Sequence, residues 1–260
     1  MDPGMRTSAS GMIAQQKMVD VIANNLANVN TTAFKRSRAS FEDVLYETVQ
    51  GPRTVDGDAS IGPLQIGHGV RLNAVTPIQT QGAPEVTGRP LDVVINGEGF
   101  FQVQMPDGSI GYTRDGSFSL SATGQLVTSD GNAVIPNIVI PADTTNVTIG
   151  ADGTVSVTGG KTNQTVEVGK LDLARFANPT GLLALGGNLY GETTASGAPT
   201  VGAAEQDGYG SIIQGSLESS NVEIVQEMTD MIAAQRAYEI NARAISAAET
   251  MSKDIDDLIQ

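Results

Sequence analysis

Glycine and proline are absent from two long stretches of this 260-residue chain, and this absence limits the folds open to it. Neither residue occurs between Met12 and Gln50 or between Ser216 and Gln260, whereas all but three of the 30 glycines lie in residues 41–214. Glycine and proline weaken helices and build tight turns. Their distribution therefore predicts a helix at each end of the chain and a turn-rich β region between the two.

Apolar residues repeat every seven positions in both end segments, as they do in coiled coils. The first segment has Met5, Met12, Val19 and Leu26 in one register, and the last has Ile224, Met231, Tyr238 and Ile245, joined by Ala234 and Ala248. The segment up to Ser40 holds five Lys and Arg against two Asp and Glu, and the segment from Gly215 holds three against nine. Opposite charge favours pairing of the two ends. Two ordinary amphipathic helices on one globular core are the alternative interpretation.

The middle of the chain contains short apolar runs separated by Asp-Gly pairs, which favour tight reversals because glycine accepts a positive φ. These runs predict a predominantly antiparallel β domain. The candidate strands are residues 92–95, 100–105, 110–113, 125–128, 133–135, 147–149, 154–157, 165–168 and 171–176. We expect Phe100, Val103, Phe118, Leu126 and Val127 in its core.

The expected fold class is therefore α+β, with N- and C-terminal α-helices pairing as a coiled coil, a central antiparallel β-rich domain and an extended linker. Residues 47–73 are polar and weakly patterned, which is typical of a linker or of a loop shaped by its neighbours. The predicted boundaries are 1–33 and 221–260 for the terminal helices, 34–75 for the extended linker and 76–220 for the β-rich domain.

Composition argues against several functions. A net charge of −14 disfavours nucleic-acid binding, and the absence of cysteine removes thiolate chemistry and cysteine-based metal sites. The single histidine, His68, lies between two glycines, which is a poor support for catalysis. We expect no catalytic residue, no metal and no cofactor. We also expect a chain that is not membrane-embedded, and residues 1–30 do not show the pattern of a secretory signal peptide, so export by a route without a cleaved signal stays open.

The run from Ala23 to Thr31 is unusual because asparagine is a poor helix former, yet it recurs here on a helical face. Frayed helix ends with asparagine caps are one explanation. Side-chain bonding between packed subunits is the other, and it is favoured because Leu26 and Val29 continue the apolar seam. The predicted assembly interface is Asn24, Asn25, Leu26, Asn28, Val29, Ile224, Met231, Ala234, Tyr238, Ile245 and Ala248.

Five stretches of the chain, in order, resemble the bacterial flagellar rod and hook axial family. They are residues 22–31 with Phe34-Lys35-Arg36, 97–103, 106–118, 124–128, and 218–222 with 231–241. Residues 41–46 and 65–70 look most like the members that form the distal part of the rod. Two departures stand out. Ala33 replaces the usual glycine, so we expect a different φ at this turn, and Pro3 and Gly4 stand where helical residues are usual.

The resemblance implies a structural subunit of the flagellar basal body, exported without a cleaved signal peptide and polymerised into a rod that spans the periplasm and carries torque to the hook. The implied partners are further copies of the chain, the proximal rod proteins, the hook protein, and the ring proteins of the peptidoglycan layer and outer membrane. Another rod or hook axial subunit is an alternative. A β-rich surface binding module with helical arms is the alternative from a different class, and a carboxylate-based enzyme acting on peptidoglycan is a third.

Overall fold

The computed structural model describes residues 3–50, 53–55, 59–61, 63–159 and 164–259. The chain divides into two compact units, each built from separate stretches of sequence. The helical unit comprises Met1–Ala27, Ser37–Pro77 and Val222–Gln260. The β-rich unit comprises Asn28–Arg36 and Ile78–Asn221. The chain therefore passes between the units four times.

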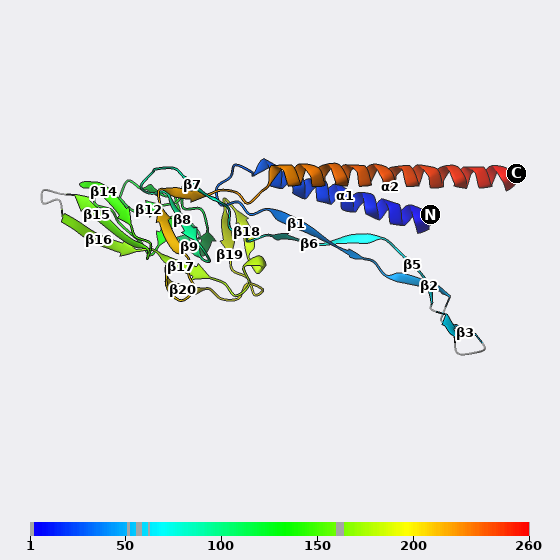
Figure 1. Cartoon of the computed structure of the whole chain (residues 1–260), viewed down its shortest axis with the longest axis horizontal. Helices are drawn as coiled ribbons and strands as arrows, with labels where there is room; N and C mark the ends of the chain where they lie inside the picture. Colours follow the sequence, from blue (N-terminus) through cyan, green and yellow to red (C-terminus); the bar gives the residue numbers. More distant parts are fainter. Residues whose placement is uncertain (1–2, 51–52, 56–58, 62, 160–163, 260) are drawn as a thin grey trace. The chain divides into compact units, whose positions relative to one another are not determined.

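The helical unit contains the two predicted helices, α1 (Pro3–Ala27) and α2 (Ile224–Ile259), which run alongside each other in opposite directions (Figure 1). Asn25 near the end of α1 bonds to Glu227 near the start of α2. Nearer the start of α1, a Cβ built on Gly11 would lie 3.0 Å from Nδ2 of Asn241 in the middle of α2. These two contacts fix the antiparallel direction. The described residues of α1 start at Pro3, a residue type that a first helical turn tolerates because its N–H groups have no helical acceptor.

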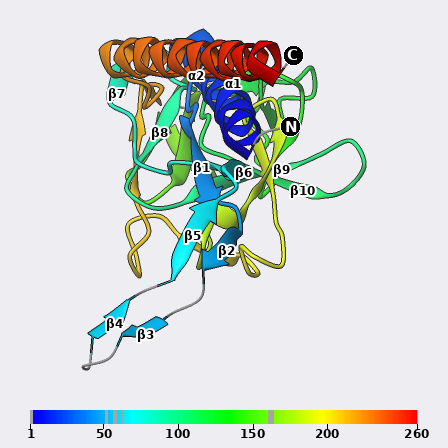
Figure 2. The same cartoon turned by 90° about the vertical axis from the view of Figure 1, so that its right-hand side faces the viewer.

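A long antiparallel hairpin completes the helical unit (Figure 2). Its ladder pairs β1 (Ser37–Asp43) with β6 (Val70–Pro77), β2 (Tyr46–Gln50) with β5 (Leu64–Gly67), and β3 (Arg53–Val55) with β4 (Ala59–Ile61). The sequence predicted an extended linker here, so the pairing is a correction. The five residues of β2 are all exposed. A strand with no buried face lacks the alternation of apolar and polar residues that identifies strands in a sequence.

The β-rich unit is built around a nine-stranded sheet in the order β11-β12-β13-β9-β10-β19-β18, with β17 also on β9 and β20 on β17. A three-stranded sheet, β14-β15-β16, and two strand pairs, β8 with β21 and β7 with β22, complete it. All pairings are antiparallel, and all nine predicted strands are present. The elements are β7 (Pro84–Val86), β8 (Val93–Asn96), β9 (Phe100–Gln104), β10 (Ile110–Thr113), β11 (Ser119–Leu120), β12 (Leu126–Val127), β13 (Ala133–Ile135), β14 (Thr144–Ile149), β15 (Thr154–Gly159), β16 (Gln164–Lys170), β17 (Asp172–Arg175), the 3-10 turn η1 (Pro179–Gly181), β18 (Leu183–Gly186), β19 (Leu189–Gly191), β20 (Thr200–Ala203), β21 (Ser211–Gln214) and β22 (Ser216–Glu218).

The four Asp-Gly pairs between residues 91 and 176 act as predicted at three positions. Gly108, Gly131 and Gly153 have φ of 85°, 86° and 86°, the left-handed conformation that glycine adopts without strain. Gly116 serves a different purpose. A side chain there would collide with the backbone carbonyl of Val93, so glycine is needed for close approach of two segments.

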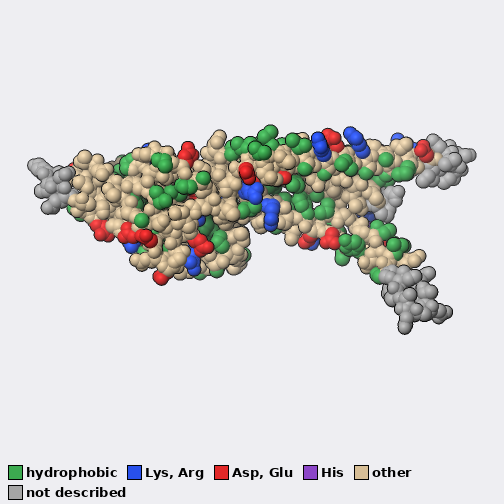
Figure 3. Space-filling model, viewed as in Figure 1, with side chains coloured by type: hydrophobic (Ala, Val, Ile, Leu, Met, Phe, Trp, Pro, Cys, Tyr) green, Lys and Arg blue, Asp and Glu red, His purple; other side chains and the backbone are tan. Residues whose placement is uncertain are grey.

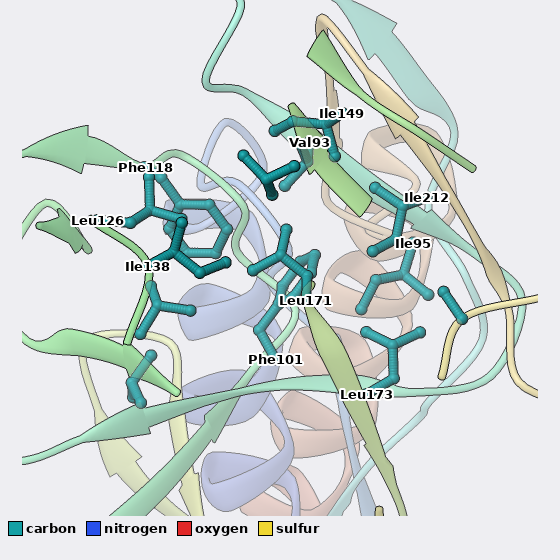
Figure 4. Close-up of a cluster of buried hydrophobic side chains, with 14 residues drawn as sticks. Val93, Ile95, Phe101, Phe118, Leu126, Ile138, Ile149, Leu171, Leu173 and Ile212 are labelled. Carbon is teal, nitrogen blue, oxygen red and sulfur yellow. The ribbon is translucent and has the colours of Figure 1, made fainter. Parts of the chain in front are cut away.

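The core of the β-rich unit forms two clusters because β9 is covered on both faces. Phe101 and Val103 lie in the first cluster, where the rings of Phe101 and Phe118 meet edge to face at 5.2 Å (Figure 4). Phe100 belongs to the second cluster, with Tyr112 and Phe176 among its neighbours. Adjacent residues of a strand point to opposite faces, so Phe100 and Phe101 bury different sides of the sheet. Of the five predicted core residues, four are fully buried and Val127 is half-buried.

Candidate assembly surface and buried junction

One face of α2 lies against α1. Glu227 and Asn241 both approach α1, and residues seven or fourteen positions apart share a helix face. Ala234 and Ala248 occupy the same heptad position as these two residues. We call Glu227, Ala234, Asn241 and Ala248 the inner stripe of α2. Ala234 is fully buried, and Met231 and Ile245 beside the stripe are half-buried. The predicted seam residues of α2 thus include those that pack within the chain.

The opposite face of α2 is also apolar, and within the chain it is exposed. Val225, Met228, Ile232 and Ile240 are 76%, 52%, 50% and 66% exposed, and we call them the outer stripe. Figure 3 shows hydrophobic side chains gathered over the beginning of α2 and basic side chains farther along it. A helix with one buried and one solvated face normally carries polar residues on the solvated side. An exposed apolar stripe of this kind marks an interaction surface.

A groove of about 550 Å³ follows the line where α1 and α2 meet. Val19 and the glutamines Gln15 and Gln16 line it from α1, and Tyr238 lines it from α2 together with Gln235 and Glu239. Tyr238 is 43% exposed there, and Ile224 at the start of α2 is also exposed. These two predicted interface residues therefore do not pack fully within the chain.

Asn25 is buried and bonds within its own chain. Its Oδ1 accepts the backbone N–H of Ser37 at 2.8 Å, while its Nδ2 donates to the Ser37 carbonyl at 2.9 Å and to Oε2 of Glu227 at 3.1 Å. Within the single chain these bonds join Asn25 to β1 and α2, and the bonding between subunits that the sequence predicted for this residue stays a prediction. Asparagine is a poor helix former, but it is tolerated here because both the oxygen and the nitrogen of its side-chain amide make hydrogen bonds. Asn24 is exposed, and Leu26, Asn28 and Val29 are half-buried.

A cluster of three charged side chains is buried in the β-rich unit. Glu218, at the end of β22, accepts hydrogen bonds from Nζ of Lys35, from Nε of Arg114 at 2.8 Å and from the N–H of Gly82 at 2.9 Å. Lys35 also donates to the carbonyl of Thr80 at 2.7 Å. The Lys35 and Glu218 side chains are 1% and 0% exposed. The carboxylate therefore joins two cations that lie far apart in the sequence.

The protonation of the cluster follows from burial and charge acting in opposite directions. Burial alone would raise the pKa of Glu218, but the charges of Arg114 and Lys35 and their hydrogen bonds hold it below its ordinary value. Burial lowers the pKa of Lys35, and the charge of Glu218 opposes this only in part. Arg114 donates further bonds to backbone carbonyls, among them Gly97 at 2.9 Å. Its guanidinium is thus well satisfied although it is buried.

Asn221 lies at the point where the chain leaves the β-rich unit. Its Oδ1 accepts the N–H of Arg36 at 2.7 Å, and its Nδ2 donates to the carbonyls of Ile78 at 2.8 Å and Thr80 at 3.0 Å. Arg36 and Ile78 are two of the other residues at which the chain crosses between units. One asparagine therefore holds three of the four crossings from within the β-rich unit.

Ala33 was expected to change the turn after α1, and this expectation is wrong. Its φ is 56°, the left-handed conformation that a glycine would adopt here, and its methyl group is buried. The N–H of Ala33 donates to the Glu218 carbonyl at 2.8 Å, which holds the conformation in place. Tertiary bonding thus imposes a conformation that alanine disfavours locally.

Sequence reasoning did not select Lys35, Arg114, Glu218 or Asn221 as site residues, although all four lie in the stretches that carry the family resemblance. A lysine directly after Phe34 and an arginine directly after a predicted strand were the available signals. Within the ranges that the structure describes, no group of three or more metal-ligating side chains comes together. Neither helix, over its described residues, is long and apolar enough to cross a membrane.

Comparison with known proteins identifies the class of this chain. The model of the flagella basal body rod protein family matches residues 5–35, that of the flagellar hook protein FlgE/F/G D1 domain matches residues 94–157, and that of the flagellar basal body rod FlgEFG protein C-terminal region matches residues 213–258. The charge cluster draws one residue from each matched region.

Relatives that match over nearly the whole chain are also flagellar basal-body rod proteins. The flagellar basal-body rod protein FlgG of Buchnera aphidicola subsp. Acyrthosiphon pisum is 47% identical over 99% of this chain and 100% of its own length. The FlgG proteins of Caulobacter vibrioides and Bacillus subtilis are 46% and 39% identical, each over at least 95% of both chains. The chain belongs to the family of flagellar basal-body rod proteins, and it is a structural subunit of the flagellar rod.

Proposed function

We propose that this chain polymerises through α1 and α2 into the distal rod, the part of the drive shaft that carries torque to the hook. The observation that carries the proposal is the outer stripe of α2, which leaves four large apolar side chains exposed on a helix whose inner stripe is already used. A neighbouring copy that covers the outer stripe would bury both faces of α2. Contact between two different surfaces on each copy produces an open helical polymer rather than a closed dimer.

The finer claims rest on the same helices. The heptad repeats support a coiled-coil arrangement of α1 and α2 in the polymer. The proposed interface residues are Asn24, Asn25, Leu26, Asn28 and Val29 of the first segment and Ile224, Met231, Ala234, Tyr238, Ile245 and Ala248 of α2. Ala234 and Ala248, on the inner stripe, would contribute by allowing close approach of α1, and the outer stripe would contribute the contact with the next copy.

The proposed partners follow from the place of a rod in the envelope. They are further copies of the chain, the proximal rod proteins, the hook protein, and ring proteins in the peptidoglycan layer and outer membrane. The chain would reach this place by export without a cleaved signal peptide, and would act mechanically rather than as an enzyme. A role as another rod subunit is the second candidate, because the rod protein FlgF of Caulobacter vibrioides is 35% identical over 97% of this chain.

Hydrogen exchange on the purified full chain tests the proposal. Alanine-rich helices gain most of their stability from packing, and within the described part of one chain only the inner stripe of α2 is packed. We therefore expect α1 and α2 to exchange quickly in the monomer and slowly in the polymer, while β9 stays protected in both. Electron microscopy of the same sample should show straight rods. Protection of residues 231–248 equal to that of β9 in a verified monomer would contradict the proposal.

A further inference from the structure

The segment between α1 and β1, Asn28–Arg36, is part of the β-rich unit although both of its sequence neighbours belong to the helical unit. We call it the collar. Its backbone is tied to four residues that lie far away in the sequence. The collar bonds join the Thr32 carbonyl to Asn188 Nδ2 at 3.0 Å, Ala33 N–H to the Glu218 carbonyl at 2.8 Å, the Phe34 carbonyl to Asn221 N–H at 3.3 Å, Arg36 N–H to Asn221 Oδ1 at 2.7 Å and the Arg36 carbonyl to Ile78 N–H at 2.8 Å.

Lys35 adds a charged anchor to these backbone bonds. Its ammonium group is buried and donates to two acceptors of the β-rich unit, the Glu218 carboxylate and the Thr80 carbonyl. A buried charge is tolerated only where its partner and its hydrogen bonds are all in place. The carboxylate is in turn held by Arg114 and Gly82, which belong to the same unit. The position of Lys35 therefore depends on a folded β-rich unit.

We propose that the collar folds with the β-rich unit in the free subunit, so that α1 orders during assembly from a base that is already fixed. The ordering of α1 during assembly rests on the proposed function, whereas the folding of the collar in the free subunit does not. Ordering a segment costs conformational entropy for each residue. With the collar formed in advance, this cost at assembly is confined to α1, α2 and the hairpin. Lys35, Glu218 and Asn221 are then positioning residues, because they hold the collar in place before α1 becomes ordered.

The test compares two changes in the full-chain monomer, with exchange of the Ala33 amide as the readout. Asn221→Ala removes bonds to Arg36, Ile78 and Thr80 but leaves the acceptor of Ala33 in place. We expect Ala33 to exchange at least about tenfold faster, while β9 keeps its protection. Asn146→Ala, an exposed asparagine on β14 of the same unit, is the matched control and should leave Ala33 unchanged.

The second change breaks α2 instead. Ala234→Pro disrupts the helix interior, and Ala33 should stay within about twofold of the parent rate because the five collar bonds all join partners in the β-rich unit. The proposal is overturned if Ala33 exchanges as fast as α1 in the parent monomer, or if Ala234→Pro accelerates it as much as Asn221→Ala does. Failure of the proposed function gives a different result, the absence of polymer, whatever the rate at Ala33.

Discussion

Asn25 and Ser37 are joined by two hydrogen bonds. The asparagine side chain bonds both the N–H and the carbonyl of the serine backbone, as a residue of a neighbouring strand would. Oδ1 of Asn25 accepts the Ser37 N–H at 2.8 Å, and Nδ2 donates to the Ser37 carbonyl at 2.9 Å. Only a side chain with both a donor and an acceptor can make this pair. The last turn of α1 is therefore joined to the first residue of β1 inside the helical unit.

Asn25→Asp should weaken assembly. The aspartate keeps the bond from the Ser37 N–H but leaves the Ser37 carbonyl without its donor and places a negative charge beside the buried Glu227. A lost buried bond with an unsatisfied partner costs about 2 kcal/mol, which corresponds to about thirtyfold in the critical concentration measured by sedimentation. Adding Glu227→Gln should recover part of the loss, because the amide introduced on α2 would offer a donor to the aspartate. A critical concentration unchanged by Asn25→Asp would show that the bond is not used.

Ala33 provides a test of the strained turn in the β-rich unit. Ala33→Gly relieves about 1–2 kcal/mol of left-handed strain but loses a buried methyl group and adds chain entropy to the unfolded state, so the free energy of unfolding should change by less than about 1 kcal/mol. Ala33→Val should cost more than about 2 kcal/mol, since a β-branched residue is strained at φ of 56° and the site is buried. Urea unfolding of the two variants measures both, and equal stability would argue against a left-handed turn.

Glu218→Gln should destabilise the β-rich unit by about 3–5 kcal/mol at pH 7, because two buried cations lose their counter-charge. The pKa of Glu218 is held below its ordinary value of 4.5 in the folded chain. At a pH between the folded and the unfolded pKa of Glu218, the unfolded chain binds more protons than the folded chain. The stabilisation from Glu218 is therefore complete above about pH 4.5 and is lost as the pH falls through the folded pKa.

The difference in the free energy of unfolding between the parent and Glu218→Gln should therefore become smaller as the pH falls below about 4.5. Urea unfolding at a series of pH values measures it. Glu85→Gln is the matched control, because Glu85 is an exposed carboxylate on β7 beside the same strand. It should change stability by less than about 0.5 kcal/mol. A gap between parent and Glu218→Gln that stays constant throughout acid titration would mean that Glu218 is not charged in the folded chain.

Phe118→Ala and Ile245→Asp should affect different properties. Phe118 is fully buried against Phe101, and deletion of its ring should cost about 3–5 kcal/mol in the β-rich unit. Ile245 is half-buried on α2, in the other unit, so Ile245→Asp should abolish polymerisation and leave the melting of the β-rich unit unchanged. Calorimetry and sedimentation on both variants check this. If Ile245→Asp lowered the melting temperature of the β-rich unit as much as Phe118→Ala does, α2 would belong to the same cooperative core as Phe118.

The sequence predicted the elements whose signals are local. Helices α1 and α2 follow from the absence of glycine and proline, and the nine central strands from apolar runs between turns. The hairpin from β1 to β6 was missed as paired structure because its exposed strands, such as β2, have no buried face to impose alternation.

The buried junction was missed for a different reason. Lys35, Arg114 and Glu218 meet only in the folded chain. The available signals, a lysine after Phe34 and an arginine after a predicted strand, do not by themselves tell a buried cation from a solvated one. Asn25 was partly foreseen, because an asparagine on a helical face needs a partner. Whether that partner lies in the same chain or in a neighbour is decided by the tertiary structure.

Ile232→Asp tests the central claim most directly, because Ile232 lies on the outer stripe and is half exposed in the single chain, so its replacement leaves the inner stripe of α2 intact. If a neighbouring copy covers the outer stripe, an ionised carboxylate buried there costs several kcal/mol in every subunit. Sedimentation combined with electron microscopy should then find only monomers, with the melting of the β-rich unit unchanged. Rods formed by Ile232→Asp at the parent's critical concentration would contradict assembly through this face of α2.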